Sequence, residues 1–493
     1  RPGMVLFSVV VLFLCVGILT PKEMLEGFSN KGMITVALLF LVSEGIRQSG
    51  TLGQVIKKLL PQGKTTVFKA QLRILPSVAF ISAFLNNTPV VVIFAPIIKH
   101  WAKSVKLPAT KFLIPLSYVT ILGGICTLIG TSTNLVVHGM ILEAGYEGFT
   151  MFELGKVGIF IAIAGIIYLF IFSKRLLPDA RPDTAVPDEE VEEGEKLHRV
   201  EAVLGARFPG INKKLSDFNF QRHYGAEVKE IKTRNGQRYV DHLEDVVLRE
   251  GDTLVVMADD TFIPTWGESS VFVLLTNGND PDTSGKKKRW LALILLVLMI
   301  VGATVGELPA TKEMFPDIKL DMFFFVCITT IIMAWTNIFP ARKYTKYISW
   351  DILITIACAF AISKAMVNSG VADCVAGFII GLSDDYGPHV LLAILFVITN
   401  LFTELITNNA AAALAFPLAL SISAQLGVSP TPFFVVICMA ASASFSTPIG
   451  YQTNLIVQGI GNYKFTDFVR IGLPLNIITF LISVILIPLI WNF

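Results

Sequence analysis

Leu85-Asn86-Asn87-Thr88-Pro89 decides how this chain is organised, and a counterpart lies far downstream at Ile406-Thr407-Asn408-Asn409-Ala410. Both stretches interrupt an apolar run with uncharged amide and hydroxyl side chains. Lipid cannot hydrogen-bond to such groups, or to the unwound backbone that they imply, so both are expected to line a cavity enclosed by protein. Paired breaks of this kind at matching positions indicate the binding site of a transporter.

The two stretches belong to an internal duplication of the chain. When Asn87 is placed on Asn408, other positions of the two halves also correspond. The equivalent pairs are Pro96 and Pro417, Ser49-Gly50 and Ser369-Gly370, and, after a slip of one residue, 130–137 and 450–457. A repeat of this size has to be recognised before any local prediction is made.

The composition is that of a polytopic membrane protein. Of the 493 residues, 53% are hydrophobic and 16% are charged, and the mean hydropathy is +0.65. The 6 cysteines lie in apolar segments without regular spacing, which argues against a disulfide framework or a zinc site. The chain starts with Arg1, and the apolar run 4–19 is expected to be a retained helix, because no small-residue cleavage site of a signal peptide follows it.

Domain boundaries are predicted where the apolar runs stop. The predicted segments are membrane repeat 1 at 1–176 with a re-entrant hairpin at 72–100, a linker at 177–196, a small α/β domain at 197–275, a basic linker at 276–289, and membrane repeat 2 at 290–493 with a hairpin at 390–426. The two halves of the first hairpin, 72–85 and 89–100, are expected to be too short to cross about 30 Å of hydrocarbon. Within the α/β domain, strands are expected at 226–231 and 253–257, a turn at Asn235-Gly236 and a helix at 213–218.

Charge asymmetry predicts that the two repeats have opposite orientations. The loop 99–111 of the first repeat is rich in lysine, whereas the equivalent loop 421–432 carries no charge. A basic connection before the first hairpin likewise corresponds to Asp384-Asp385 before the second. Because Lys and Arg favour the cytoplasmic side, the expected fold is a polytopic α-helical membrane protein with two inverted repeats. Residues 177–289 are expected to be cytoplasmic, in a protein of the plasma membrane.

Each break is expected to bind an anion through the half-helix that follows it. The free N–H groups and the dipole at the start of a helix make a positive end that suits an anion. Pro89 fits the first helical turn, where its missing N–H removes no bond. Uncharged side chains beside these ends favour release of a divalent anion over permanent capture. The predicted substrate-binding residues are Asn87, Thr88, Asn408, Asn409, Ser132, Thr133 and Thr453.

A cation is expected to bind with the anion, because an anion alone is repelled inside a membrane. Unwound carbonyls and the oxygens of Asn, Ser and Thr suit a small hard cation such as Na⁺, and no Cys or His cluster indicates a softer metal. The predicted Na⁺ ligands are Asn86, Asn87, Gly130, Asn134, Thr407, Asn408, Gly450 and Asn454. Polar kinks packed in a helix bundle are the alternative interpretation, above all for single Ser and Thr hydroxyls. No organic cofactor and no nucleic acid partner are expected.

Three charged residues stand inside apolar helices. Glu44 and Lys364 occupy equivalent positions of the two repeats, and charges within a membrane are candidates for function. An ion pair between the two, or snorkelling towards an interface, competes with a role in transport. Glu404 stands one turn before the second break, where it would influence cation binding or carry a proton.

Three motifs of the inserted domain occur in a characteristic order. They are Pro-Gly-Ile-Asn-Lys-Lys-Leu at 209–215, Arg-His-Tyr-Gly-Ala-Glu-Val at 222–228 and Leu-Arg-Glu-Gly-Asp-Thr-Leu-Val-Val at 248–256. This order resembles the RCK C-terminal (TrkA-C) domain of potassium-transport regulators and of some secondary transporters. The resemblance implies a domain that inhibits, assembles or senses a ligand, and a dimer-stabilising appendage without a ligand is the alternative.

The membrane portion also resembles a known family. Paired Asn/Thr breaks, each followed by a loop of the Gly-Thr-Ser-Thr-Asn type, are similar to the divalent anion:Na⁺ symporter family, which carries sulfate, dicarboxylates or citrate. The resemblance implies a homodimer with a scaffold and an elevator-like transport domain. Family members usually read Ser-Asn-Thr at both breaks, so Asn87, Thr88 and Asn408 carry over, whereas Asn409 replaces Thr.

A TrkA-C insert is more similar to the branch with algal and bacterial sodium/sulfate transporters. Sulfate is therefore the first expected substrate, and citrate or a C4-dicarboxylate the second. A ligand-gated ion channel is the alternative from another class, which the RCK-like domain alone favours, and the chain lacks a Thr-Val-Gly-Tyr-Gly-type filter. An enzyme is not expected, because no nucleophile and base, metal motif or nucleotide loop stands out.

Overall fold

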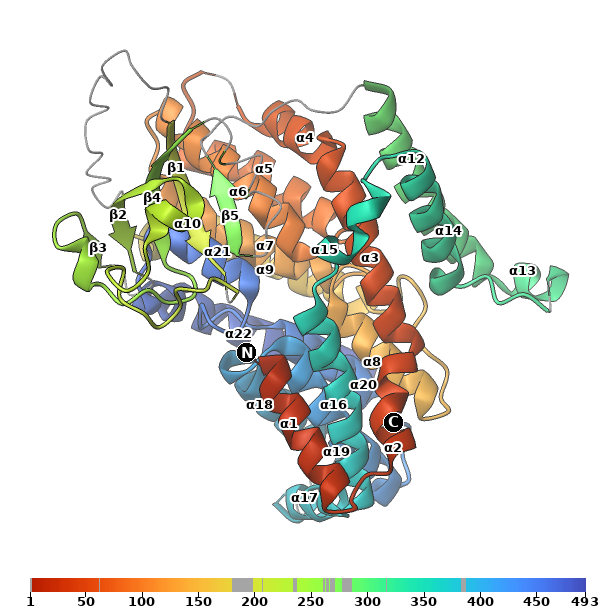
Figure 1. Cartoon of the computed structure of the whole chain (residues 1–493). Coiled ribbons are helices and arrows are strands. Elements are labelled where there is room, and N and C mark those ends of the chain that lie inside the picture. The colour runs from red at the N-terminus through yellow and green to blue at the C-terminus, as the bar shows by residue number, and fades with distance from the viewer. Residues whose placement is uncertain are drawn as a thin grey trace.

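The computed structural model describes residues 2–61, 63–179, 198–205, 207–233, 237–259, 262, 266, 271–276, 286–315, 317–382 and 387–493. Most of the two predicted linkers, the predicted turn at Asn235-Gly236 and the acidic pair Asp384-Asp385 lie outside the described residues. The described part consists of a large helical body and a small domain built on a β-sheet, inserted between α9 (Gly155–Leu176) and α12 (Lys286–Gly306) (Figure 1).

The first half of the helical body runs from α1 to α9. Its helices before α9 are α1 (Pro2–Cys15), α2 (Pro21–Glu26), α3 (Lys31–Gln48), α4 (Thr51–Leu59), α5 (Val67–Ser82), α6 (Asn87–Ser104), α7 (Leu113–Gly124) and α8 (Ser132–Glu143). The side chain of Asn30 starts α3 by accepting hydrogen bonds from the first backbone N–H groups of the helix. Thr66 does the same for α5, so this helix begins before the apolar run that predicts it.

The second half repeats this order. After α12 come α13 (Pro309–Met314), α14 (Met322–Trp335), α15 (Tyr344–Tyr347), α16 (Trp350–Asn368), α17 (Val371–Leu382), α18 (Gly387–Leu405), α19 (Asn408–Leu426), α20 (Thr431–Ser442), α21 (Gln452–Gly461) and α22 (Phe465–Ile490). Gly50 separates α3 from α4 with φ +73°, and Gly370 separates α16 from α17 with φ +72°. Only glycine adopts this conformation without strain, so the repeated Ser-Gly pair makes the same turn twice.

Among the described residues, seven helices are long and apolar enough to cross a membrane. The helices of the second hairpin, α18 and α19, are both among them, with 19 residues each. In the first hairpin, for which short halves are expected, neither α5 nor α6 is among these seven helices.

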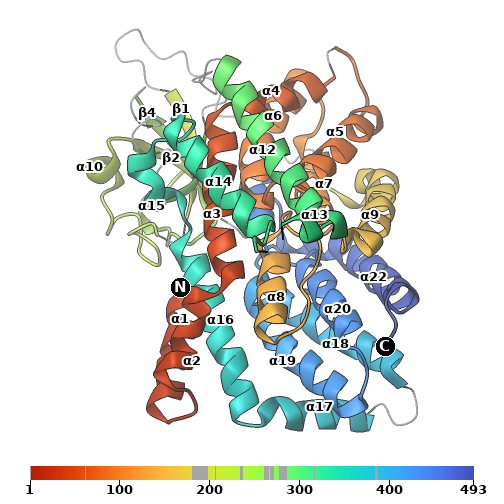
Figure 2. The same cartoon turned by 90° about the vertical axis from the view of Figure 1, so that its right-hand side faces the viewer.

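The core of the body is formed by helices that the rest of the protein surrounds. Every residue of α7 is buried, and so is α20 from Pro432 onwards. Such helices have no polar face, which explains their uniformly apolar sequences. Helix α5 packs on α7, and α18 packs on α20 in the same way. The hairpin α5/α6 lies towards one end of the body and α18/α19 towards the other, as both views show (Figure 2).

The inserted domain is a five-stranded antiparallel sheet with a core of its own. The strands are β1 (His198–Leu204), β2 (Glu227–Lys232), β3 (Arg238–Tyr239), β4 (Thr253–Ala258) and β5 (Phe272–Thr276), in the order β3-β2-β4-β1-β5. Both predicted strands are present as β2 and β4. Aromatic side chains from the short helix α10 (Phe220–Tyr224) and from Phe208 cover the sheet.

The helix predicted at 213–218 is absent from the inserted domain. The backbone there forms turns, and Asn212 has φ +63°. The segment pairs instead with the chain before β4, because Asn212 N donates to Leu248 O and Leu215 N donates to Val246 O. Long-range backbone pairing has thus overridden a local helix preference.

The sheet of the inserted domain rests on α6 and α21 (Figure 1). Lys99, near the end of α6, donates to both carboxylate oxygens of Glu201 on β1 at 3.0 Å. A Cβ at Gly459 of α21 would lie 2.7 Å from Thr253 Oγ1, so α21 and β4 approach closely. The domain therefore contacts one helix from each half of the helical body.

Candidate substrate site at the two helix breaks

Each hairpin turns at the predicted break, and its second helix starts there. Helix α6 begins at Asn87 and α19 begins at Asn408. The residues before them, Asn86 and Thr407, make no side-chain hydrogen bond to the first N–H groups of either helix. Both helix starts therefore offer uncapped N–H donors, which suit an anion.

The two asparagines are held in equivalent ways. Ser82 donates its hydroxyl to Asn87 Oδ1 at 2.7 Å, and Thr403 donates to Asn408 Oδ1 at 2.9 Å. Asn87 is fully buried and Asn408 is 8% exposed. Ser82 and Thr403 occupy equivalent positions of the repeats, so each break has its own hydroxyl that orients the amide.

Two further helices of the body are interrupted, one between α7 and α8 and the other between α20 and α21. Hydrogen bonds connect each interruption to a hairpin. Asn134 Nδ2 donates to Thr127 O at 2.9 Å, and Asn454 Nδ2 donates to the equivalent Thr447 O at 3.2 Å. The hydroxyl of Thr127 donates to Ala83 O, and that of Thr447 donates to Glu404 O. Sequence reasoning missed both threonines, although their equivalence in the duplication was available as a signal.

Close packing at the first loop requires two glycines. A Cβ at Gly124 would lie 2.6 Å from Asn87 Oδ1, and a Cβ at Gly130 would lie 2.5 Å from the Gly124 carbonyl oxygen. Real Cβ atoms do not approach so closely, so only glycine lets the loop close on Asn87. Gly130 thus lies beside the break, as its prediction as a ligand requires.

The two halves meet through side chains that cross between them. Thr88 of α6 donates to Gln452 Oε1 of α21 at 3.5 Å, and Ser132 of α8 donates to Asn409 Oδ1 of α19 at 3.3 Å. Thr133 also donates to Asn409 Oδ1 at 3.3 Å. The structure thus brings Ser132 and Thr133 to Asn409, and it places Thr88 beside Gln452, which was not a predicted site residue.

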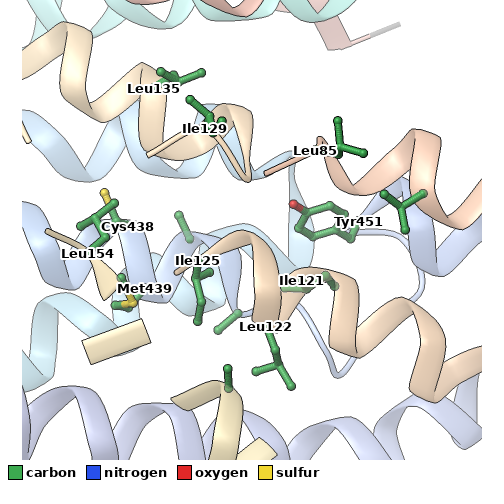
Figure 3. Packing of buried hydrophobic residues seen from close by; sticks show 14 of the residues in the cluster. Leu85, Ile121, Leu122, Ile125, Ile129, Leu135, Leu154, Cys438, Met439 and Tyr451 are labelled. Atoms are coloured by element: carbon green, nitrogen blue, oxygen red, sulfur yellow. The ribbon is translucent and has the colours of Figure 1, made fainter. Parts of the chain in front are cut away.

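Tyr451 joins the two breaks directly. Asn87 Nδ2 donates to its hydroxyl at 2.6 Å, Thr131 Oγ1 lies 3.1 Å from the same oxygen, and the side chain of Asn408 also hydrogen-bonds to it. The ring of Tyr451 is packed in the same region as Leu85 and the apolar residues of α7 (Figure 3). Sequence reasoning quoted Tyr451 within its loop but gave it no role, because an aromatic residue in an apolar chain carries no local signal.

Oxygen atoms suited to a cation lie beside both breaks. Among the described residues, Asn134 Oδ1 and Thr407 Oγ1 are buried side-chain acceptors without a hydrogen-bond partner. Asn454 Oδ1, in contrast, lies 2.6 Å from Ser117 Oγ, and Thr453 Oγ1 lies 2.9 Å from the same hydroxyl. The described residues contain no group of three or more His, Cys, Asp or Glu that could hold a metal ion.

The three charged candidates lie in different surroundings. Glu404 accepts hydrogen bonds from Ser446 N, Thr447 N and Asn476 Nδ2, at 2.8 to 2.9 Å, and so fixes the loop before Gly450. Glu44 forms its ion pair with Arg47 on its own helix, at 2.6 Å, rather than with Lys364, which is exposed. Of the three, Glu404 alone contacts the loops of the site.

A small cavity opens between the first break and the helices beside it. Its lining consists of Val36, Leu39, Val42, Ser43, Phe84, Leu85, Asn86, Ile129, Ser132, Leu135 and Leu296. The cavity has room for about one water molecule, so it is too small to hold an anion. Its polar lining residues are Ser43, Asn86 and Ser132.

Comparison with known proteins agrees with this geometry. The profile of a family described as "Citrate transporter" matches residues 1–416 and 314–493. An uncharacterized transporter of Synechocystis sp. is 30% identical over 98% of this chain and 93% of its own length.

Two further relatives have names that state a substrate. The probable sodium/sulfate cotransporter 3 of Chlamydomonas reinhardtii is 32% identical over 57% of this chain, which covers 31% of that protein. The sodium-dependent dicarboxylate transporter SdcS of Staphylococcus saprophyticus is 25% identical over 29% of this chain and 28% of its own length. Because the profile matches the whole length and a full-length relative is 30% identical, the chain belongs to the citrate transporter family.

Proposed function

We propose that this transporter is a sodium-coupled symporter of a divalent oxyanion, with sulfate as its first substrate. The observation that carries the proposal is the convergence of two uncapped helix starts, whose first residues Asn87 and Asn408 bind the same hydroxyl of Tyr451. Two positive helix ends at one buried point favour a doubly negative solute. Relatives named as sodium/sulfate cotransporters support the choice of sulfate.

The anion binds, in this proposal, through side chains that carry no formal charge. Thr88, Ser132 and Asn409 lie at or beside the helix starts. The hydrogen bonds of Thr88 to Gln452 and of Ser132 to Asn409 are long, and an oxyanion can replace them at small cost. A fixed Lys or Arg there would hold a divalent anion too strongly for release, whereas helix dipoles and hydroxyls permit turnover.

Sodium completes the charge balance of the proposed site. Relatives named as sodium-dependent transporters of sulfate and of dicarboxylates support Na⁺ as the coupling ion for either anion. Asn134 Oδ1 and Thr407 Oγ1, buried without a partner among the described residues, are the oxygen donors that Na⁺ would satisfy. Asn87, Gly130 and Asn408 lie beside them as further ligands, and Asn86, Gly450 and Asn454 remain candidates.

Inverted repeats and an elevator movement are part of the same proposal. The pairs α5/α18, α6/α19, α7/α20 and α8/α21 correspond in order, and the hairpins lie towards opposite ends of the body (Figure 2). We assign α3, α12, α14 and α16 to the scaffold of a homodimer, and the hairpins with the broken helices to the moving part. The inserted domain is proposed to be TrkA-C-like and cytoplasmic, in a plasma-membrane protein.

A carboxylate substrate is the second candidate, and the cavity beside the first break favours it. Most of the side chains that line the cavity are apolar, and they suit the hydrocarbon part of a dicarboxylate or of citrate better than they suit sulfate. The family's description as a citrate transporter points in the same direction.

Uptake of radiolabelled sulfate into proteoliposomes tests the proposal. We expect saturable uptake that requires an inward Na⁺ gradient and that unlabelled sulfate competes more strongly than succinate or citrate. Uptake that ignores the Na⁺ gradient would contradict the coupling, and stronger competition by succinate or citrate would move the assignment to carboxylates. Large single-channel currents in planar bilayers would replace the symporter by an ion channel.

A further inference from the structure

Tyr451 occupies a position at which the two repeats differ in side-chain size. It precedes α21 as its N-terminal cap residue, and the equivalent residue before α8 is Thr131. The hydroxyl groups of both residues meet at 3.1 Å. The second repeat therefore extends a ring to the point at which the first repeat has a short side chain.

The hydroxyl of Tyr451 has no spare hydrogen-bonding capacity. A phenol has one proton and accepts through its oxygen lone pairs, and here Asn87, Thr131 and Asn408 all bind it. The amide oxygens of both asparagines also accept from Ser82 and Thr403. Every polar side chain of the deep layer, formed by Asn87, Asn408, Thr131 and Tyr451, thus has a partner within the protein.

A second group of polar residues is held by longer hydrogen bonds. This outer layer consists of two pairs, Thr88 with Gln452 at 3.5 Å and Ser132 with Asn409 at 3.3 Å. Gln452 is exposed and Thr88 and Ser132 are half-buried, whereas Asn409 is as buried as Asn408, at 8% exposure. Three of the four residues are thus more exposed than the residues of the deep layer, which are all buried.

We propose that Tyr451 is the specificity-determining residue of the site, which confines the anion to the outer layer and so selects compact oxyanions. Sulfate carries both charges on one centre and is satisfied by the outer layer together with the two helix starts. A dicarboxylate has two charged groups separated by a carbon chain, and its second carboxylate would need the space that the ring fills. The inference rests on the proposed function, because it assigns the choice of anion to that same site.

Substitution of Tyr451 tests the inference in the full-length protein. Tyr451→Thr copies the residue of the other repeat and removes the ring, and Tyr451→Phe keeps the ring and removes the hydroxyl. Tyr463→Phe is the matched control, because Tyr463 is a buried phenol that donates to Thr110 O, away from the breaks. The measurements are kcat/KM for Na⁺-driven uptake of sulfate and of succinate in proteoliposomes, and the thermal shift that each anion causes in detergent.

We expect Tyr451→Thr to lower the ratio of kcat/KM for sulfate to that for succinate by about tenfold or more, since a contact or clash at one position discriminates by roughly this factor. Succinate should then raise the melting temperature of Tyr451→Thr but not of the wild type. Tyr451→Phe and Tyr463→Phe should keep the wild-type preference. If Tyr451→Thr keeps the wild-type ratio and thermal shifts, or if Tyr451→Phe admits succinate although its ring remains, the inference is overturned.

Measurements on the wild-type protein distinguish a failure of the proposed function from a failure of the inference about Tyr451. Wild-type protein that takes up sulfate with Na⁺ supports the proposed function, whatever the variants do. Wild-type protein that prefers succinate overturns the sulfate assignment and this role of Tyr451 together. Should Tyr451→Thr fail to accumulate in the membrane, Tyr451→Phe decides, because admission of succinate by that variant refutes selection by the ring and its continued exclusion supports it.

Discussion

Asn87 and Asn408 are held by neighbours that also correspond between the repeats. Ser82 and Thr403 donate hydrogen bonds to the amide oxygens, and the hydroxyl of Tyr451 forms a further hydrogen bond with each amide. An amide that is hydrogen-bonded at both its oxygen and its nitrogen keeps its orientation. At the scale of single residues, the site is preorganised by hydroxyl groups rather than by charges.

Replacement of either asparagine by alanine should abolish Na⁺-driven sulfate uptake. Asn87→Ala leaves the buried hydroxyl of Ser82 without its acceptor, which costs about 1–3 kcal/mol, and it removes one of the three partners of Tyr451, so the break becomes disordered. Initial uptake rates in proteoliposomes, normalised to the protein inserted, check this. Asn368→Ala is the control, because Asn368 lies exposed at the end of α16, where it bonds Ile18 O and Glu23. Near-normal transport by Asn87→Ala or by Asn408→Ala would remove that residue from the site.

Much of the residue set followed from the duplication alone. Asn87, Asn408, Thr88, Asn409 and Ser132 were predicted and lie together in the structure. Ser82, Thr403 and Tyr451 were not predicted, because each stands outside a break or looks like core. Hydroxyl groups near a break acquire their role only from the tertiary contact that they make.

The broken helices are the elements whose loops complete the site. Glu404 ends α18 with a carboxylate that accepts from the backbone N–H groups of Ser446 and Thr447. The equivalent residue in the first repeat, Ala83, offers only its carbonyl, to Thr127. The second loop is therefore held to its hairpin by a buried side chain, whereas the first loop is held by a backbone carbonyl group.

Glu404→Gln should weaken Na⁺ dependence more than it weakens the fold. The amide keeps the shape but offers one acceptor oxygen, so a backbone N–H of Ser446 or Thr447 loses its partner, at a cost of about 1–3 kcal/mol. We expect KM for Na⁺ to rise by about tenfold, since 1.4 kcal/mol corresponds to that factor. Uptake rates across a series of Na⁺ concentrations measure it. Glu143→Gln, at the exposed end of α8, is the control. An unchanged KM for Na⁺ in Glu404→Gln would show that the loop does not bear on the cation.

Gly123→Ala should destabilise the packing of α5 on α7. The added Cβ would lie 2.1 Å from the Ala79 carbonyl oxygen, so the helices must separate, at a cost of about 1–3 kcal/mol. Thermal unfolding in detergent should show a lower melting temperature. At Gly377 of α17 a Cβ meets only Gln425 Oε1 at 3.7 Å, and alanine there should be neutral or stabilising. Equal melting temperatures for Gly123→Ala and the wild type would contradict the close approach.

Element types were predictable where periodicity and length were clear, and boundaries were less so. Helices α18 and α19 span 387–405 and 408–426, close to the predicted hairpin at 390–426, whereas α4 and α13 were not predicted. The buried residues of α4 are Thr51, Leu52 and Ile56, and lysines occupy its exposed end. From the sequence alone these lysines indicate a basic loop, because the apolar face is too short to be recognised without the surface that it packs on.

At the scale of the whole molecule, the inserted domain and the helical body are joined by a charged contact. The carboxylate of Glu201 lies between Lys99 of α6 and Lys232 of β2. Burial alone would raise the pKa of Glu201, but the two ammonium groups outweigh it and lower the pKa from 4.5 to about 2. The contact is therefore ionised and intact at neutral pH.

Acid should release the inserted domain from α6. A carboxyl group whose pKa is lowered by folding stabilises the folded state above its unfolded pKa of about 4.5, and this contribution of about 3 kcal/mol is lost as the pH falls towards 2. Glu201→Gln should remove it at neutral pH. Hydrogen exchange of β1 and of the end of α6 should then be faster in this variant. Glu227→Gln is the control, because its pair with Lys229 is exposed on both sides. Equal exchange rates in Glu201→Gln and the wild type would show that the ion pair does not hold the domain.

The arrangement of the whole followed from the sequence only in part. The inserted sheet domain and the repeated order of helices were predicted, because composition changes abruptly at the borders and the motifs recur. The contact of the inserted domain with α6 and α21 was not predicted. In the sequence, Lys99 is one of several lysines in a basic loop and Gly459 is one glycine of an apolar helix. A contact between segments that are distant in the sequence produces no periodic pattern from which it could be predicted.

One helix reaches from the site to the inserted domain. Thr88 stands at the start of α6 and Lys99 about 11 residues later, so roughly 16 Å of helix separates a proposed anion contact from a contact with the inserted domain. If the proposed site moves during transport, the inserted sheet has to move with it for as long as Lys99 stays bound to Glu201.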